Sequence, residues 1–391
     1  MISVEQALDI AFELARPLDT ETIDLASGAD RVLARAAHAG HDQPPFDASA
    51  MDGYAARAAD CVPGVRLQVV GEVAAGGGFQ GRIGTGQAVR IFTGAPLPEG
   101  ADRVIIQEDV TTGNDTITLA QAPDPNTYIR HKGSDFAKGT RFDPPCRLGP
   151  AQLALLATMN VARITVTRKP DVAIIATGDE LVELGSTLQP GQIISSNSIA
   201  LAQIVRSEGS NPRILPIARD NEASLRAAFE LARGADLIVT TGGASVGDYD
   251  LVGPVARELG LQTGFYKVAM RPGKPLMAGR MGDTMLLGLP GNPVSAQVCA
   301  HVFLRPVLRK MTGLPAAALP TLNGTLASAL GPNGPRAHYM RAVIGTDGRL
   351  TPAASQDSAM TAIMAGASAL IVRPAHDPAR PKASPVDYLP L

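Results

Sequence analysis

Apolar runs and amphipathic segments alternate along the chain from about residue 166. Each short apolar run predicts a buried strand, and the helical spacing of apolar residues after it predicts a helix. The expected strands are 171–178, 213–220, 236–243 and 284–291, and the expected helices are 198–209, 221–235, 248–260 and 293–313. Such alternation is typical of a parallel sheet covered on both faces by helices. We therefore predict a central three-layer α/β domain with a mostly parallel sheet over residues 166–315.

The first 38 residues carry a different, helical pattern. Ser3 with Gln6 forms a capping box, and apolar residues follow at helical spacing. We expect residues 1–38 to be helical, and a further helical stretch within 133–165 to rejoin them. Together these two segments predict an N-terminal helical or linker domain.

Short strands dominate the two remaining segments. Residues 39–132 hold alternating runs separated by glycines, at 65–75, 88–94 and 103–110. They predict a small β-rich module inserted into the N-terminal domain. A proline-rich joint near 315–321 precedes residues 316–391, for which we predict a small C-terminal β domain with a hairpin turn at Asp347-Gly348.

Charge and cysteine usage exclude several classes of protein. The 391 residues include 35 basic and 37 acidic ones, a net charge of −2, which argues against a nucleic-acid surface. Three distant cysteines in no CxxC spacing indicate neither a disulfide framework nor a zinc site. The acidic, amphipathic start is unlike an export signal, and no apolar run is long enough to cross a membrane. We expect a cytoplasmic protein that binds neither nucleic acid nor membrane.

The most informative stretch is LIVTTGGASVGDYD, residues 237–250. An apolar strand ends in Thr241, Gly242 and Gly243, and a polar turn with Ser245 leads to a helix. In open parallel sheets, ligands bind at the carboxyl ends of the strands, where glycines let an anion approach the backbone. Taken alone, this turn is equally compatible with a tight connection that binds nothing.

Acidic residues follow several of the expected strands. Glu180 lies beside Asp179 after the first strand, Asp220 ends the second, and Asp250 follows the third. Like charges gathered at one edge of a sheet repel each other unless a cation bridges them, and carboxylates suit a hard cation. We therefore expect Glu180, Asp220 and Asp250 to hold Mg²⁺. Any one of them is equally compatible with capping a helix.

A basic, proline-bracketed loop follows at 266–279. Lys267, Arg271 and Lys274 lie within eight residues, and LPGNP at 289–293 adds Pro290 and Pro293 before a helix. A rigid basic loop suits a polyanionic ligand, although such lysines are more often ordinary surface residues. Neither a Walker A motif nor GxGxxG is present, which disfavours P-loop and dinucleotide chemistry.

Six segments occur here in one order: PPFDASAMDGYA, IFTGAPLPEGAD, ATGDEL, TTGGASVGDYD, KVAMRPGKP and LPGNPVSA. This succession resembles the molybdopterin molybdotransferases, the family of bacterial MoeA and the E domain of gephyrin, over essentially the full chain. The resemblance implies an enzyme of molybdenum cofactor biosynthesis. With Mg²⁺ assisting, such an enzyme inserts molybdate into adenylylated molybdopterin and releases AMP.

The resemblance also implies an elongated homodimer, with a cleft between the central domain of one subunit and the β-rich module of the other. The residues it implies for the site are Asp52 and Thr93 from the module, Glu180, Asp220, Asp250, Lys267, Arg271, Pro290 and Pro293 from the central domain, and Arg341 and Ser358 from the tail. Many relatives carry lysine at position 271 and differ around Ser358. A molybdopterin adenylyltransferase and a recipient molybdoenzyme are implied as possible partners.

Two other functions remain open from the sequence. A molybdopterin adenylyltransferase has the same central fold, but normally needs neither the β-rich module nor the tail. A scaffold with an inherited, inactive site would cluster partners through its dimer, although the acids and the basic loop are retained here.

Overall fold

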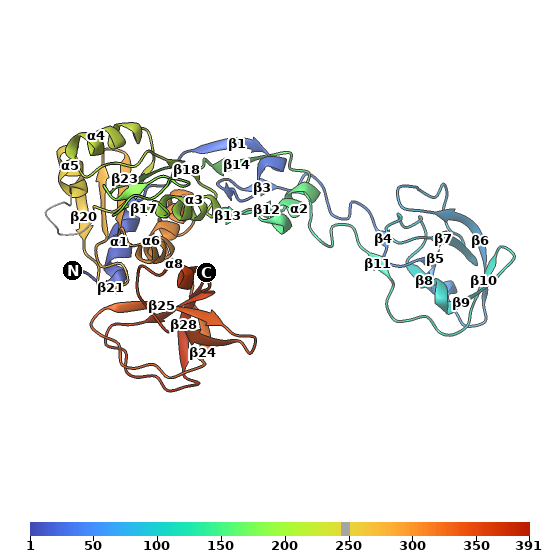
Figure 1. The fold of residues 1–391 in the computed structure, drawn as a ribbon. Coiled ribbons are helices and arrows are strands. Elements are labelled where there is room, and N and C mark those ends of the chain that lie inside the picture. Colours follow the sequence, from blue (N-terminus) through green and yellow to red (C-terminus); the bar gives the residue numbers. More distant parts are fainter. Residues whose placement is uncertain (244–250) are drawn as a thin grey trace.

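A computed structural model describes residues 1–243 and 251–391. The molecule is elongated, with the central and C-terminal domains at one end and the β-rich module at the other (Figure 1). A small sheet lies between these two ends. The predicted α/β multidomain architecture, with an inserted β-rich module and a C-terminal β domain, is confirmed.

The central domain is built on a six-stranded sheet with the order β18-β15-β19-β23-β22-β20. The first four of these strands are parallel, and β22 and β20 add antiparallel pairs at one edge. The bounds are β15 Asp171–Ala176, β18 Asn211–Ile214, β19 Leu237–Thr241, β20 Gln262–Tyr266, β22 Met277–Met281 and β23 Thr284–Leu289, with the short pair β16 Leu181–Val182 and β17 Ile193–Ile194 beside them.

Helices cover both faces of this sheet, so the predicted three layers are confirmed. One apolar core joins the sheet to α1, α3, α6, η4 and α7, and a second joins it to α4 and α5. The bounds are α1 Val4–Leu14, α3 Asn197–Ser207, α4 Glu222–Leu231, α5 Val252–Glu258, α6 Pro293–Cys299, η4 Ala300–Leu304 and α7 Arg305–Met311.

The expected helix 293–313 contains a π-helical turn, η4, between α6 and α7. Pro306 follows this turn. A proline inside a helix has no N–H to donate, and its ring crowds the carbonyl four residues earlier. The wider π turn relieves that crowding, so the helix continues to Met311.

The expectation that residues 1–38 are helical is wrong beyond Leu14. α1 begins with the predicted capping box of Ser3 and Gln6, and its apolar face packs into the central core. Pro17 follows its end, and the β-branched segment that starts at Thr20 forms strand β1. α1 is therefore part of the central core.

The small sheet between the two ends has the order β1-β14-β2-β13. A helix, α2, packs on it around a core that includes Leu33, Leu148 and Val166. The bounds are β1 Thr20–Asp24, η1 Leu25–Ser27, β2 Val32–Leu33, β13 Cys146–Arg147, α2 Pro150–Thr158 and β14 Arg163–Thr167, and the pair β3 Ala37–His38 with β12 Arg141–Phe142 leads outward.

The β-rich module has one six-stranded sheet, in the order β8-β5-β7-β6-β10-β9. Two apolar clusters, one around Leu67 and one around Val89, lie within the module. The bounds are β4 Ala48–Ser49, β5 Gly53–Ala56, η2 Ala58–Asp60, β6 Arg66–Val73, β7 Gln87–Ile91, β8 Arg103–Ile106, η3 Gln107–Asp109, β9 Val110–Gly113, β10 Thr116–Leu119 and β11 Ile129–Arg130.

The C-terminal strands form a sheet that closes on itself, because β25 pairs with both β26 and β27. The predicted hairpin turn at Asp347-Gly348 connects β25 and β26. The strand β21, Met270–Arg271, comes from the basic loop of the central domain and pairs with β25. The bounds are β24 Leu322–Leu326, β25 Ala337–Ile344, β26 Arg349–Pro352, α8 Thr361–Ala365, β27 Ala369–Arg373 and β28 Pro385–Pro390.

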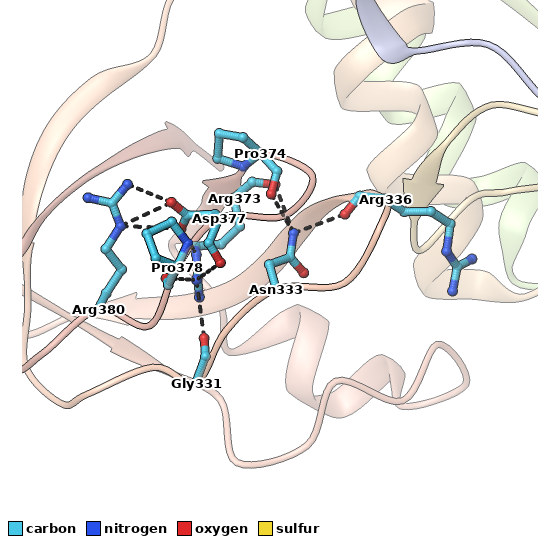
Figure 2. A network of polar contacts seen from close by, with 8 residues as sticks. All are labelled: Gly331, Asn333, Arg336, Arg373, Pro374, Asp377, Pro378 and Arg380. Atoms are coloured by element: carbon cyan, nitrogen blue, oxygen red, sulfur yellow. Dashed lines mark hydrogen bonds and ion pairs between the residues drawn. The ribbon is translucent and has the colours of Figure 1, made fainter.

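A polar network ties together the loops of this C-terminal domain (Figure 2). The buried Asp377 carboxylate accepts from Arg373 and from Arg380, and the hydrogen bond from Arg380 is the main reason why its pKa is lowered. Asn333 donates to the carbonyls of Arg336 and Pro374 at 2.9 and 2.6 Å. The Arg336 side chain points away from this network (Figure 2), toward the carbonyl of Met270 at 3.5 Å.

Candidate active site

A pocket of about 720 Å³ lies at the carboxyl ends of the parallel strands β15, β19 and β23. This is where open α/β sheets bind their ligands. Predicted site residues contribute much of its lining, namely Glu180, Asp220, Thr241, Gly242, Gly243, Pro290 and Pro293. The sequence motifs that follow three strands therefore meet at one place.

Glycine is required at the turn after β19. Gly242 has a φ of 89°, and a methyl group on it would lie 2.5 Å from the carbonyl oxygen of Thr177. Gly243 has a φ of 58°, and a methyl group there would lie 2.4 Å from the side chain of Val252. Gly291 of the LPGNP segment comes so close that its methyl group would lie 3.4 Å from the Cα of Gly242. Two glycine-rich loops thus meet at the floor of the pocket.

Three acidic side chains, Asp179, Glu180 and Asp220, lie near one another after strands β15 and β18. Asp179 and Asp220 accept from each other's backbone N–H, at 3.1 and 3.3 Å. The Glu180 carboxylate lies over Gly178, where a methyl group would be 2.5 Å from one of its oxygens. Burial raises the pKa of Asp220 above its ordinary value, and the charges of Asp179 and Glu180 raise it further.

These carboxylates have the chemistry that a hard cation needs. Glu180 and Asp220 both line the pocket and can supply oxygen ligands, and the pKa of Asp220 is raised first by burial and then by the charges of Asp179 and Glu180. Within the described residues, no group of three histidine, cysteine or acidic side chains is arranged to hold a metal. The third predicted ligand, Asp250, lies outside the described residues, as does Ser245.

The basic loop lies beside the pocket and joins it to the C-terminal domain. Its Pro275 lines the pocket, whereas Lys267, Arg271 and Lys274 are not among the lining residues. The loop is held firmly: the Lys267 N–H donates to the carbonyl of Leu276 at 2.9 Å, and Lys267 itself has a φ of 68°. Its Nζ lies 5.0 Å from the ring centre of Tyr266.

Two tail residues have different surroundings. Ser358 Oγ accepts from Asn292 Nδ2 at 3.0 Å, and its carbonyl accepts from the N–H of Val294 at 3.1 Å, so the tail is fastened to the LPGNP segment. Arg341 is fully buried, and its guanidinium donates to the carbonyls of Asp357 and Ser355 at 2.7 and 3.4 Å. These hydrogen bonds hold the segment before Ser358 in place, and Arg341 is not among the residues that line the pocket.

The remaining predicted pair lies on the β-rich module. One Asp52 carboxylate oxygen accepts from both the N–H and the hydroxyl of Thr93, each at 2.8 Å, which lowers the pKa of Asp52. Both residues lie at the ends of strands β5 and β7, at the far end of the molecule from the pocket (Figure 1). Within one chain, the structure does not bring them to the other site residues.

Sequence reasoning missed several lining residues, above all Asn197 at the start of α3. Its Nδ2 donates to the carbonyl of Gly291 at 2.7 Å, and its Oδ1 is buried with no hydrogen-bond partner. Ser195 and Ser196 line the same wall. The polar segment SSNS ahead of an expected helix was the available signal, since serine and asparagine favour helix starts.

No helix in the described part of the chain is long and apolar enough to cross a membrane. Three segments of the chain match sequence models of known families. Residues 2–160 match the MoeA N-terminal region (domain I and II), residues 173–310 match a probable molybdopterin binding domain, and residues 323–391 match the MoeA C-terminal region (domain IV).

Individual relatives agree with these matches. The molybdopterin molybdenumtransferase of Nostoc sp. is 40% identical over 328 residues, which cover 80% of this chain and 75% of the relative. That of Haemophilus influenzae is 40% identical over 317 residues, covering 80% and 78%. The crystal structure of a MoeA molybdopterin biosynthesis protein from Pyrococcus horikoshii superposes with a TM-score of 0.80 at 30% identity, covering 99% of this chain and 98% of that one. The chain therefore belongs to the MoeA family of molybdopterin molybdenumtransferases.

Proposed function

We propose that this protein inserts molybdenum from molybdate into adenylylated molybdopterin and releases AMP. The observation that carries the proposal is the pocket itself. Two glycine turns and a pair of acidic side chains meet there at the carboxyl ends of three parallel strands. The proposed substrates are those of the family to which the chain belongs, and the pocket is where their anionic groups would bind.

The electrostatic task of such an enzyme is to hold two anions together. Molybdate is a dianion, and the phosphoanhydride of the substrate is anionic too. Two unit charges ~4 Å apart repel by about 4 kcal/mol in a partly screened site. We assign the offsetting interactions to Lys267, Arg271 and Lys274 beside the pocket and to the backbone amides around Gly242.

We further propose that Glu180 and Asp220, with Asp250, hold Mg²⁺. When bound, the ion would polarise the phosphoanhydride and stabilise AMP as a leaving group. The chain itself needs no nucleophile, because substrate sulfurs or a molybdate oxygen can attack. Its own residues bind and orient the anions, and the glycine turns let the anions approach the backbone.

The position of Asp52 and Thr93 supports a site shared between two subunits. They lie at the far end of the molecule from the pocket of their own chain (Figure 1). We infer that the protein is a homodimer in which the β-rich module of one subunit completes the pocket of the other.

Mixing two inactive variants tests the shared site. Asp52→Ala removes the module's carboxylate and Asp220→Asn removes a pocket carboxylate, so each homodimer should be inactive. In a mixed population about half of the dimers are heterodimers, and one of their two sites carries both intact residues. We expect recovery of about one quarter of the wild-type rate. No recovery after subunit exchange would mean that each chain uses its own module.

The reaction is tested directly by AMP release. The purified protein is incubated with adenylylated molybdopterin and molybdate, with and without EDTA. Molybdate-dependent AMP release, slowed severalfold or more by EDTA, supports the proposal. If EDTA leaves the rate unchanged, the Mg²⁺ assignment is wrong. If the protein instead forms adenylylated pterin from ATP and molybdopterin, it is an adenylyltransferase.

Partners and location follow from the same proposal. We expect an adenylyltransferase to supply the substrate and a molybdoenzyme to receive the product. A cytoplasmic location fits Cys61, Cys146 and Cys299, all of which are free thiols.

A further inference from the structure

The small sheet between the two ends of the molecule is joined to the central domain by two passages of the chain. The first passage contains Leu18, whose N–H donates to the carbonyl of Met311 at 2.9 Å. The second contains Arg168, whose guanidinium binds the Asp236 carboxylate through two hydrogen bonds of 2.7 and 2.6 Å. Two connections define a line about which one body can still turn relative to the other. A third contact is needed to fix the angle.

A buried carboxylate, Glu208, supplies that contact. It follows α3 in the central domain, and its side chain is 2% exposed. It accepts from Arg305 Nε at 2.6 Å and from an Arg147 guanidinium nitrogen at 3.3 Å. Arg305 belongs to α7 of the central domain, whereas Arg147 belongs to β13 of the small sheet. One carboxylate therefore holds arginines from two bodies.

The backbone makes an independent contact at the same joint. Gly209 has a φ of 75°, and a methyl group on it would lie 2.8 Å from the carbonyl oxygen of Asp30 in the small sheet's first turn. Arg147 reinforces this approach by donating to the carbonyl of Ser207 at 2.6 Å and to the Asp30 carboxylate at 3.2 Å. The two surfaces meet closely enough to require a glycine.

Arg305 is also held by a second contact inside the central domain. Its guanidinium also bonds to Nδ1 of His301 at 3.3 Å, from the π turn η4. Burial, assisted by Arg305, lowers the pKa of His301 to about 4, so the imidazole is neutral and accepts this bond. Because Arg305 compensates the buried charge, replacing Arg147 should loosen the joint without leaving an unpaired carboxylate in the central domain.

We propose that Glu208 and Gly209 are positioning residues for the reaction. They fix the angle of the small sheet, and thereby the direction in which the β-rich module carries Asp52 and Thr93 toward the partner's pocket. This inference rests on the shared site proposed above. A displacement of ~1 Å between reacting groups can cost a factor of about 100 in rate, so a loosened joint far from the pocket would still slow the reaction.

Distance measurements by pulsed electron spin resonance test the joint itself. Spin labels are attached at Ala157→Cys on α2 and Ala227→Cys on α4, both exposed, in a Cys146→Ser background. The other two cysteines are buried, and burial raises the pKa of each thiol, to about 11 for Cys61, so neither should react with the label at neutral pH. Labelled subunits are diluted with unlabelled ones, so that each distance arises within one chain.

Arg147→Met and Gly209→Ala should each broaden or shift the distance distribution relative to the wild type. Matched controls on the β-rich module are Arg82→Met, which breaks an exposed ion pair with Glu99, and Gly64→Ala, which has a φ of 78° and open space around it. Both controls should leave the distribution unchanged. If both joint variants give the wild-type distribution, the joint does not fix the angle and the inference is overturned.

Kinetics then test the positioning role. The pocket residues are intact in Arg147→Met, so KM for adenylylated molybdopterin should stay close to wild type while kcat falls ~10–100-fold. Arg147→Lys, which keeps the charge, should recover part of that loss. A loosened joint with an unchanged kcat would overturn the role in the reaction and count against the shared site. A wild-type protein that releases no AMP would instead refute the proposed function, while the distances would still report on the joint.

Discussion

Replacing Gly242 by alanine should destabilise the central domain more than its backbone conformation alone explains. Gly242 has a φ of 89°, and an L-residue in that region costs about 1–2 kcal/mol. The new methyl group would also lie 2.5 Å from the carbonyl oxygen of Thr177. That carbonyl cannot easily move aside, because the Thr177 N–H donates to Thr241 at 2.9 Å and fixes the end of β15 against β19. Overpacking of this kind adds ~1–3 kcal/mol.

Gly234 provides a matched control for this prediction. It lies in the same domain with a φ of 83°, but nothing lies within 4 Å of an added methyl group. Gly234→Ala should therefore show the conformational cost of about 1–2 kcal/mol alone. Gly242→Ala should exceed it by ~1–3 kcal/mol, and should also slow AMP release because the turn is displaced from Gly291.

The assay must report on the central domain, since a protein of several domains need not unfold in one step. Urea titrations monitored by hydrogen exchange in the peptide covering β19 meet that need. The difference between the two alanine variants is the informative quantity. Equal stabilities for Gly242→Ala and Gly234→Ala would refute the steric argument, and with it the claim that the two glycine turns are tightly packed.

Three further predictions concern single side chains. Burial, and then the charge of Arg271, lower the pKa of His338 from 6.5 to about 4. As the pH drops from 6.5 toward 4, the unfolded chain binds a proton at this residue before the folded chain does, so the free energy of unfolding should fall. His338→Gln should flatten this pH dependence in urea titrations between pH 7 and 4.5. The pKa of Asp220 is raised by burial and by the charges of Asp179 and Glu180, so its ionisation at rising pH destabilises the fold. Asp220→Asn should therefore raise the melting temperature at pH 7 yet slow AMP release at least about tenfold. A lower melting temperature would contradict this account of burial and like charge. Arg341→Met leaves the carbonyl of Asp357 unpaired and should destabilise the C-terminal domain by ~1–3 kcal/mol, which thermal unfolding can detect.

The sequence predicts those helices and strands in which apolar residues recur at a regular spacing. Strands β15, β19 and β23 and the helices around them follow from apolar runs alone, because strands covered on both faces are apolar throughout. The capping box predicts the start of α1, but the expected helical length, to residue 38, is wrong because α1 ends at Leu14. The strand after it, Thr20–Asp24, is largely exposed and mostly polar, so no apolar alternation distinguishes it from a loop.

The site was predictable only as far as its residues share one sheet edge. Glu180, Asp220 and Gly242 meet in the pocket because topology places the ends of parallel strands together. Asn197 follows the strand pair β16–β17, which is only two residues long in each strand and leaves no periodic signal. The full burial of Arg341 could not be predicted either. An arginine in a sequence can bind a ligand or donate to buried backbone carbonyls, and the sequence does not distinguish these two roles.

The pairing of β3 with β12 brings the two ends of the inserted segment together, with His38 opposite Arg141. A short turn joining these two positions would excise the β-rich module without cutting any strand of the remaining sheets. The module's apolar clusters leave with it, together with Ala39 and Phe136 from the edge of the small sheet's core, and every residue that lines the pocket stays. The shortened chain should therefore retain the central core and its ligand affinity while lacking turnover. The excised piece, supplied separately, would become an activator, and its potency would measure how much the covalent connection contributes.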